Sequence, residues 1–169
     1  MINNLFFALT LVSALGCGLI AGVFFAFSTF VMKALASLPP AQGIAAMQSI
    51  NVTVLNPWFL GTFFGTAVAC ILLAVASLIT WHRPGAAYIL VGSVLYLFGT
   101  VLVTIAFNVP HNEKLATVDA TSMNAVNVWA QYVTSWTTWN HVRTAAALAA
   151  AASLTVALCL RSANNNPIG

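Results

Sequence analysis

Residues 5–32 read LFFALTLVSALGCGLIAGVFFAFSTFVM, and none of them is charged. A helix needs roughly 20 apolar residues to cross the hydrocarbon of a bilayer. The stretch is longer than the roughly 7–15-residue apolar region of a signal peptide, and no basic segment precedes it. It therefore predicts a retained transmembrane helix rather than a cleaved leader.

Three further apolar runs follow, at residues 57–81, 86–107 and 137–160. Lipid cannot hydrogen-bond to the backbone, so a spanning segment must be a helix or belong to a closed barrel. The runs do not alternate polar and apolar residues as barrel strands do. We expect an all-α integral membrane four-helix bundle over residues 1–161, followed by a polar C-terminal tail at residues 162–169.

The composition supports lipid as the main solvent. Of the 169 residues, 61% are hydrophobic and 4% are charged, whereas soluble domains carry about 25% charged residues. The five cations are dispersed along the chain, so no basic patch predicts nucleic-acid binding. The three cysteines are isolated in apolar runs and are typical of small buried hydrophobes, with metal ligation as the alternative.

The connections between the spans are unequal in length. A short turn, His82–Gly85, joins the second and third spans, while residues 33–56 and 108–135 form two long connections. Both long connections must lie on the same side of the membrane. Arg83 and Arg161 favour a cytoplasmic short turn, although Lys33 and Lys114 oppose this. We expect a bacterial inner-membrane protein with its long loops outside.

Each long connection also contains a short helical pattern, which predicts interfacial helices. Ile44, Met47, Ile50 and Val54 recur at helical spacing in the first connection, and Ala125, Val128, Trp129, Tyr132 and Trp136 do so in the second. The aromatic group of Trp129, Tyr132, Trp136 and Trp139 suits either an anchor among lipid headgroups or a stacking surface for a ligand. Pairs of small residues such as Gly18 and Gly22 permit close helix packing, within one bundle or between copies in a homo-oligomer.

Polar side chains gather on the long-loop side: Asn51, Asn108, Asn112, Asn140, His141 and Arg143. Ionisable groups at membrane depth tend to face the bundle interior and to mark function. Helix capping by the asparagines and snorkelling by Arg143 are the structural alternatives. A metal or haem held by His111 and His141 is another alternative, although the ligand spacing of a metal site is absent.

These motifs resemble those of the anthrone oxygenase family of small four-helix membrane proteins. The resemblance rests on Gly22–Ser28, on Met47–Asn51, on Asn108-Val109-Pro110 with Asn112, and on Trp139–Thr144, and it covers most of the chain. Characterised members oxidise anthrones to anthraquinones with molecular oxygen, without a metal or organic cofactor. His111 departs from the family pattern, which usually has an apolar residue at this position.

The resemblance implies roles for the polar residues. His141 would act as the base, while Arg143, Asn112 and Asn140 would hold the developing oxyanion. Asn51, Asn108, Trp129, Tyr132, Trp136 and Trp139 would bind a hydrophobic aromatic molecule, an anthrone or a hydroquinone. The alternative function is a noncatalytic membrane subunit that binds a quinone or lipid, or that supports a partner.

Overall fold

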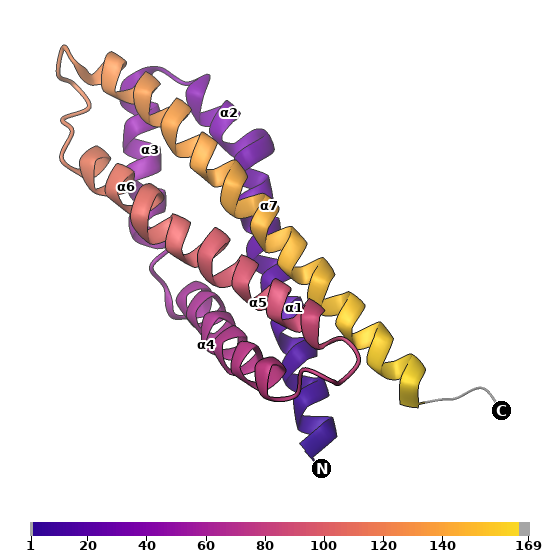
Figure 1. Ribbon diagram of the computed structural model, residues 1–169. Coiled ribbons are helices and arrows are strands. Elements are labelled where there is room, and N and C mark those ends of the chain that lie inside the picture. Colours follow the sequence, from indigo (N-terminus) through magenta and orange to yellow (C-terminus); the bar gives the residue numbers. More distant parts are fainter. Residues whose placement is uncertain (1, 166–169) are drawn as a thin grey trace.

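The computed structural model describes residues 2–165, and in this part of the chain all regular secondary structure is helical, with no strand (Figure 1). The helical elements, in chain order, are α1 (Ile2–Ala26), η1 (Phe27–Val31), α2 (Met32–Ala36), α3 (Pro40–Thr53), α4 (Pro57–Ile79), α5 (Ala86–Val94), η2 (Leu95–Leu102), η3 (Thr104–Asn108), α6 (Val109–Ala116) and α7 (Ala125–Asn165). The three η elements are π-helical.

Four stretches of helix are long and apolar enough to cross a membrane, which fits an integral membrane protein and confirms the predicted fold class. They are residues 4–36, 57–79, 86–116 and 125–162. The first combines α1, η1 and α2, and the third combines α5, η2, η3 and α6.

The structure divides into a membrane part and a cap. α4 has 23 residues, which gives about 35 Å of helix, enough for the hydrocarbon core. The other three stretches are longer, and α3 lies beyond the end of α4 alongside their extensions (Figure 1). We call α2, α3, α6 and residues 125–141 of α7 the cap.

The outer face of α7 marks the boundary between these parts. It is polar along the cap and apolar afterwards. The exposed cap residues on this face are Asn127, Gln131, Thr134, Thr138 and His141. Val142 and Leu148, both exposed, begin the apolar face that suits lipid.

Each part has its own core of buried side chains. The membrane core includes Phe24, Phe63 and Tyr96, and the cap core is built around Met47 and Trp136. The candidate site lies where these two cores meet.

One of the two long connections differs from the sequence-based prediction. The first long connection contains a separate short helix, α3, as predicted. The helix expected at residues 125–136 is instead the start of α7, because residues 125–161 contain neither glycine nor proline. The third span likewise continues into α6, and the π-helical turns of η3 precede Pro110, whose missing N–H would break a regular helix.

The small-residue pairs of the first two spans do not pack inside the bundle, whereas Gly92 and Gly99 of the third span lie against Ala150 and Ala146 of α7. At Gly18, Gly22, Gly61 and Gly65, no atom other than those of the adjoining helical backbone lies within 4 Å of the position that a Cβ would take. The close helix contacts are made elsewhere, for example at Gly85, the one described residue with a left-handed backbone conformation (φ +82°), which packs against Ala157 of α7.

Candidate functional site

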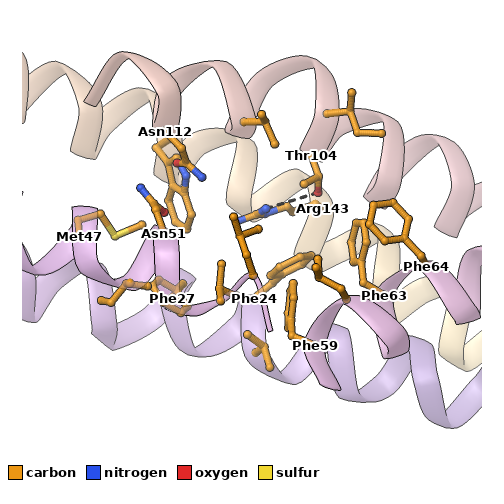
Figure 2. A pocket seen from close by; sticks show the side chains of 18 residues that line it. Phe24, Phe27, Met47, Asn51, Phe59, Phe63, Phe64, Thr104, Asn112 and Arg143 are labelled. Atoms are coloured by element: carbon orange, nitrogen blue, oxygen red, sulfur yellow. Dashed lines mark hydrogen bonds between the residues drawn. The ribbon is translucent and has the colours of Figure 1, made fainter. Parts of the chain in front are cut away.

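A cavity of about 390 Å³ lies between the cap and the membrane core (Figure 2). Small-molecule sites span roughly 300–1,000 Å³. The cavity is lined by Val23, Phe24, Phe27, Met47, Ile50, Asn51, Val54, Leu55, Phe59, Leu60, Phe63, Phe64, Thr104, Ile105, Val109, Asn112, Trp136 and Arg143. Fourteen of these side chains are apolar or aromatic, and the polar ones are Asn51, Thr104, Asn112 and Arg143.

Arg143 is the only charged residue in this lining, and 5% of its surface is exposed. Its Nε donates to Oδ1 of Asn140 at 2.8 Å, and its Nη1 donates to Oγ1 of Thr104 at 3.4 Å. The guanidinium carbon lies 3.9 Å from the ring centroid of Phe24 and 4.8 Å from that of Trp136. These contacts hold the cation against two aromatic faces, where it is attracted by the ring electrons.

Asn140 holds Arg143 in position from the side of the guanidinium that faces away from the cavity. Its side chain is fully buried and does not line the cavity. Its Nδ2 donates to the backbone oxygen of Phe24 at 2.8 Å and to Oγ of Ser28 at 2.7 Å. Both donors are therefore used, and the amide oxygen is left to accept from Arg143.

A second pair of hydroxyls extends this network. Thr144 donates to the backbone oxygen of Asn140 at 2.7 Å. Because that uses its one proton, Ser28 is the donor in the 3.1 Å contact between the two hydroxyls. Both atoms of the Asn140 amide thus have partners, and these partners fix its orientation.

Arg143 has no carboxylate partner among the described residues. The chain contains two acids, Glu113 and Asp119, and neither lines the cavity. Asp119 is exposed, and hydrogen bonds from the backbone N–H and hydroxyl of Thr121 lower its pKa. An unpaired cation buried at membrane depth is costly, and Nη2 forms no hydrogen bond within the described chain. A negatively charged oxygen in the cavity would offset this cost.

The end of the cavity away from Arg143 carries the side-chain amides of Asn51 and Asn112. Tyr132 donates through its hydroxyl to Oδ1 of Asn112 at 2.9 Å. Nδ2 of Asn51 and Nε1 of Trp136 are buried and have no hydrogen-bond partner in the described part of the chain. Figure 2 shows Asn51 and Asn112 close together at one end of the cavity, with Arg143 further along. Buried donors left unpaired cost about 1–3 kcal/mol each, and an oxygen of a ligand would relieve that cost.

The structure brings four of the predicted site residues into the cavity lining: Asn51, Asn112, Trp136 and Arg143. Two more support it from outside. Tyr132 holds Asn112, and Asn140 holds Arg143.

Four predicted residues lie elsewhere. His141 is exposed on the outer face of α7, beside a smaller pocket that Lys33 also lines. Asn108 is fully buried and donates to the backbone oxygen of Trp136 at 3.1 Å. Trp129 belongs to the cap core. Trp139 stacks on Phe107, with ring centroids 3.6 Å apart.

The alternative of a metal or haem site finds little support in the geometry. His111 lines a different pocket from His141, and its Nδ1 lies 2.6 Å from the backbone oxygen of Phe107. Within the described residues, no group of three or more His, Cys, Asp or Glu side chains could hold a metal ion.

Sequence reasoning missed the aromatic and hydroxyl lining. Phe24 lies in the Gly22–Ser28 motif, but nothing in the sequence separated it from its neighbour Phe25, which is 52% exposed. Phe59, Phe63 and Thr104 lie in apolar runs that predict only a span. These residues could have been selected only by knowing which face of each helix is turned towards Arg143, and that depends on how the helices pack.

Comparison with known protein families gives a match. The sequence pattern of the family described as anthrone oxygenase matches residues 57–153, more than half of the chain. The matched region runs from the start of α4 into α7 and includes Thr104, Asn112 and Arg143. No curated protein and no solved structure matches the chain.

Proposed function

The chain belongs to the anthrone oxygenase family, and from this premise we propose that it oxidises a flat, anthrone- or hydroquinone-like aromatic with molecular oxygen in the cavity beside Arg143. The observation that carries the proposal is the buried guanidinium of Arg143, which faces an aromatic-lined cavity and has no carboxylate partner among the described residues. The proposal places the protein in a bacterial inner membrane with its long loops outside.

The role of Arg143 follows from the chemistry of anthrones. Removal of a proton from the methylene carbon opposite the carbonyl gives an aromatic anion whose charge rests on the oxygen. A cation positioned beside that oxygen in a dry site stabilises the anion and raises its concentration. The anion reduces oxygen by one electron, and the two radicals combine at the former methylene carbon. Protonation to a hydroperoxide and loss of water give the quinone, so that one anthrone and one O₂ yield one anthraquinone and one water.

The cavity walls suit a flat ring system. Phe24 and Phe63 meet edge to face, with centroids 6.4 Å apart and planes at 65°, and Phe59 stacks on Phe63 at 6.0 Å. Flat aromatic guests bind well to such faces and edges. Asn51 and Asn112, at the other end of the cavity, suit a second oxygen of the guest.

The proposal gives His141 no direct part. The sequence suggested this histidine as the base, but it is exposed on the outer face of α7 and does not line the cavity. In this arrangement the cation carries the catalytic effect, and a single water molecule held in the cavity accepts the substrate proton and returns it to the peroxide anion, because no lining residue is a base.

The test is oxygen consumption by the purified protein in nanodiscs. We expect anthrone to be converted to anthraquinone with one O₂ consumed per turnover, in samples whose metal content has been measured by mass spectrometry. Binding of anthraquinone without any oxygen uptake would instead support the noncatalytic quinone-binding alternative. Oxygen uptake that tracks the content of a metal or haem would contradict the cofactor-free chemistry.

A further inference from the structure

The rim of the cavity is apolar and belongs to two neighbouring parts of the bundle. Four lining residues are exposed: Leu55 (65%), Phe64 (49%), Ile105 (53%) and Val109 (38%). Leu55 and Phe64 lie on the α3–α4 side, whereas Ile105 and Val109 lie on η3 and α6. The polar lining residues are buried or half-buried. The cavity therefore has an apolar mouth and a polar interior.

The packing of the helices leaves this mouth between α4 and η3. α4 packs mainly against α1, α5 and η2, while η3 packs mainly against η2, α6 and α7. The π-helical turns of η3 and the proline that follows them displace this segment from a regular helical path. α4 and η3 are therefore not principal neighbours of each other.

The mouth lies at the level of the hydrocarbon edge. It begins at the start of α4, next to Trp58, which is 87% exposed. Exposed tryptophans are typical of the membrane–water interface. Phe64 lies two turns further along a helix that can span the membrane, so that its side chain faces lipid.

The side of the cavity towards water is closed by the cap core. Met47 and Trp136 line the cavity and are 1% and 3% exposed. Behind them lie the remaining buried residues of that core, among them Ile44 and Leu115. A hydrated molecule would have to pass through close-packed apolar side chains to arrive from the cap side.

We propose that the cavity opens laterally to the bilayer between α4 and the η3–α6 segment, and that it takes its ligands from lipid: flat, uncharged aromatic molecules that become charged only beside Arg143. This inference rests on the proposed function for the identity of the ligand, but the route itself is tested without substrate. An apolar mouth admits compounds that partition into the membrane and disfavours ions and hydrated molecules.

The experiment places a thiol inside the cavity and compares reagents that arrive from lipid and from water. Met47→Cys is made in a Cys159→Ser background, since Cys159 is the exposed cysteine while Cys17 and Cys70 are fully buried. Protein in liposomes is treated with an uncharged aromatic maleimide or with a charged, membrane-impermeant one. Labelling in detergent after unfolding, compared with the Cys159→Ser protein that retains only Cys17 and Cys70, confirms that the introduced thiol is reactive.

The route is then narrowed at the mouth. Ile105→Trp adds bulk at the rim, and Leu102→Trp is the matched control, because Leu102 is 50% exposed on the same stretch of helix but does not line the cavity. We expect the uncharged maleimide to label Met47→Cys quickly and the charged maleimide to label it slowly. Ile105→Trp should slow labelling by the uncharged reagent by about tenfold, whereas Leu102→Trp should not change the labelling rate.

Other results overturn the inference. Equal labelling by both reagents would mean that the cavity opens to water. The same rate with and without Ile105→Trp, or no labelling of the folded protein, would mean that no route runs through this mouth. Ile50→Cys, a second cavity position on α3, replaces Met47→Cys if that variant does not fold. Absence of oxygen uptake with anthrone, together with the expected labelling, would remove the proposed reaction and leave the lateral opening intact.

Discussion

Arg143 is the residue on which the proposed reaction depends most. Its guanidinium is held by Asn140, Thr104 and the ring of Phe24. Lysine keeps the charge but has no planar fork to satisfy these partners. We expect Arg143→Lys to lower kcat/KM for anthrone by about 100-fold or more, as for loss of an oxyanion donor, measured by oxygen uptake.

Arg161 provides the control for this substitution. It also lies over an aromatic ring, that of Phe6 at 4.3 Å, but at the short-loop end of the bundle. Arg161→Lys should therefore leave kcat/KM unchanged. Equal losses in the two variants would point to stability rather than to the site.

Substitution of His141 distinguishes two predictions. The sequence motif makes this histidine the catalytic base, whereas the structure leaves it outside the cavity lining. The side chain is exposed and lines only the outer pocket beside Lys33. We expect His141→Ala to retain kcat/KM within about twofold of the original, and the pH profile to keep its shape. A loss of tenfold or more would return His141 to the role of base.

Asn140→Asp keeps the shape of the side chain, but it adds a negative charge and removes the two hydrogen bonds that Nδ2 donates to Phe24 and Ser28, a loss that thermal unfolding would report. Asn140→Asp would place a carboxylate against Nε of Arg143, at the position where the amide oxygen now accepts at 2.8 Å. The new ion pair would satisfy the cation internally. We expect anthraquinone binding and turnover to fall by about tenfold or more, because the charge available to a ligand is reduced.

The measurements for Asn140→Asp are ligand binding by titration and thermal unfolding. Asn127→Asp, on the exposed outer face of the cap, controls for the added negative charge. Unchanged binding in Asn140→Asp would show that the ligand does not use the charge of Arg143.

Much of this residue-scale picture could be predicted from the sequence. The asparagines and Arg143 stood out because polar groups are rare in a chain with 4% charged residues. His141 stood out for the same reason, yet it lies about 100° around the helix from Asn140, whereas Arg143 and Thr144 share a face with Asn140. The phenylalanines of the cavity could not be chosen among the 11 in the chain, because each is equally compatible with a lipid-facing position.

At the scale of elements, the joint between α3 and α4 forms one wall of the cavity. Asn56 caps α4 by accepting from the backbone N–H groups of Trp58 and Phe59, at 3.1 and 3.0 Å. It also donates to the backbone oxygen of Thr53 at the end of α3, at 3.1 Å. A single side chain thus ties the two helices together.

We expect Asn56→Ala to destabilise the protein by roughly 0.5–2 kcal/mol, the usual cost of losing an N-cap. Thermal unfolding in nanodiscs would measure this. Asn56→Asp keeps the acceptor and places a negative charge at the helix N-terminus, so it should retain most of the stability. Equal destabilisation by both substitutions would assign the effect to the donated bond to Thr53.

The extent of the elements shows where sequence patterns were insufficient. Apolar runs located the four spans, because lipid-facing helices need them. They did not show that α7 continues from the cap into the membrane, since Trp129 and Trp136 suited a separate interfacial helix equally well. Helix-breaking residues predict the ends of the helices better than the apolar runs do. Asn56-Pro57 separates α3 from α4, and α7 is continuous because residues 125–161 contain neither glycine nor proline.

At the scale of the whole molecule, the function proposed here depends on a division between a cap in water and a bundle in lipid. The cavity lies between the two cores. A substrate can therefore come from lipid while its carbonyl oxygen meets Arg143, the charged residue of the cavity lining. The asymmetry between the two ends of the bundle was visible in the lengths of the loops, but the cap as a second packed core was not, because its residues come from four separate segments.

This division predicts a sharp change in water accessibility along α7. In the Cys159→Ser background, Thr134→Cys on the outer face of the cap should react with a charged maleimide, and Leu148→Cys, about 21 Å further along the helix, should not. With long loops outside, Thr134→Cys should react in spheroplasts before permeabilisation. Reaction only after permeabilisation would place the cap in the cytoplasm. Equal reaction at both positions would contradict the membrane boundary itself, because Leu148 would then face water and the mouth of the cavity would no longer open into lipid.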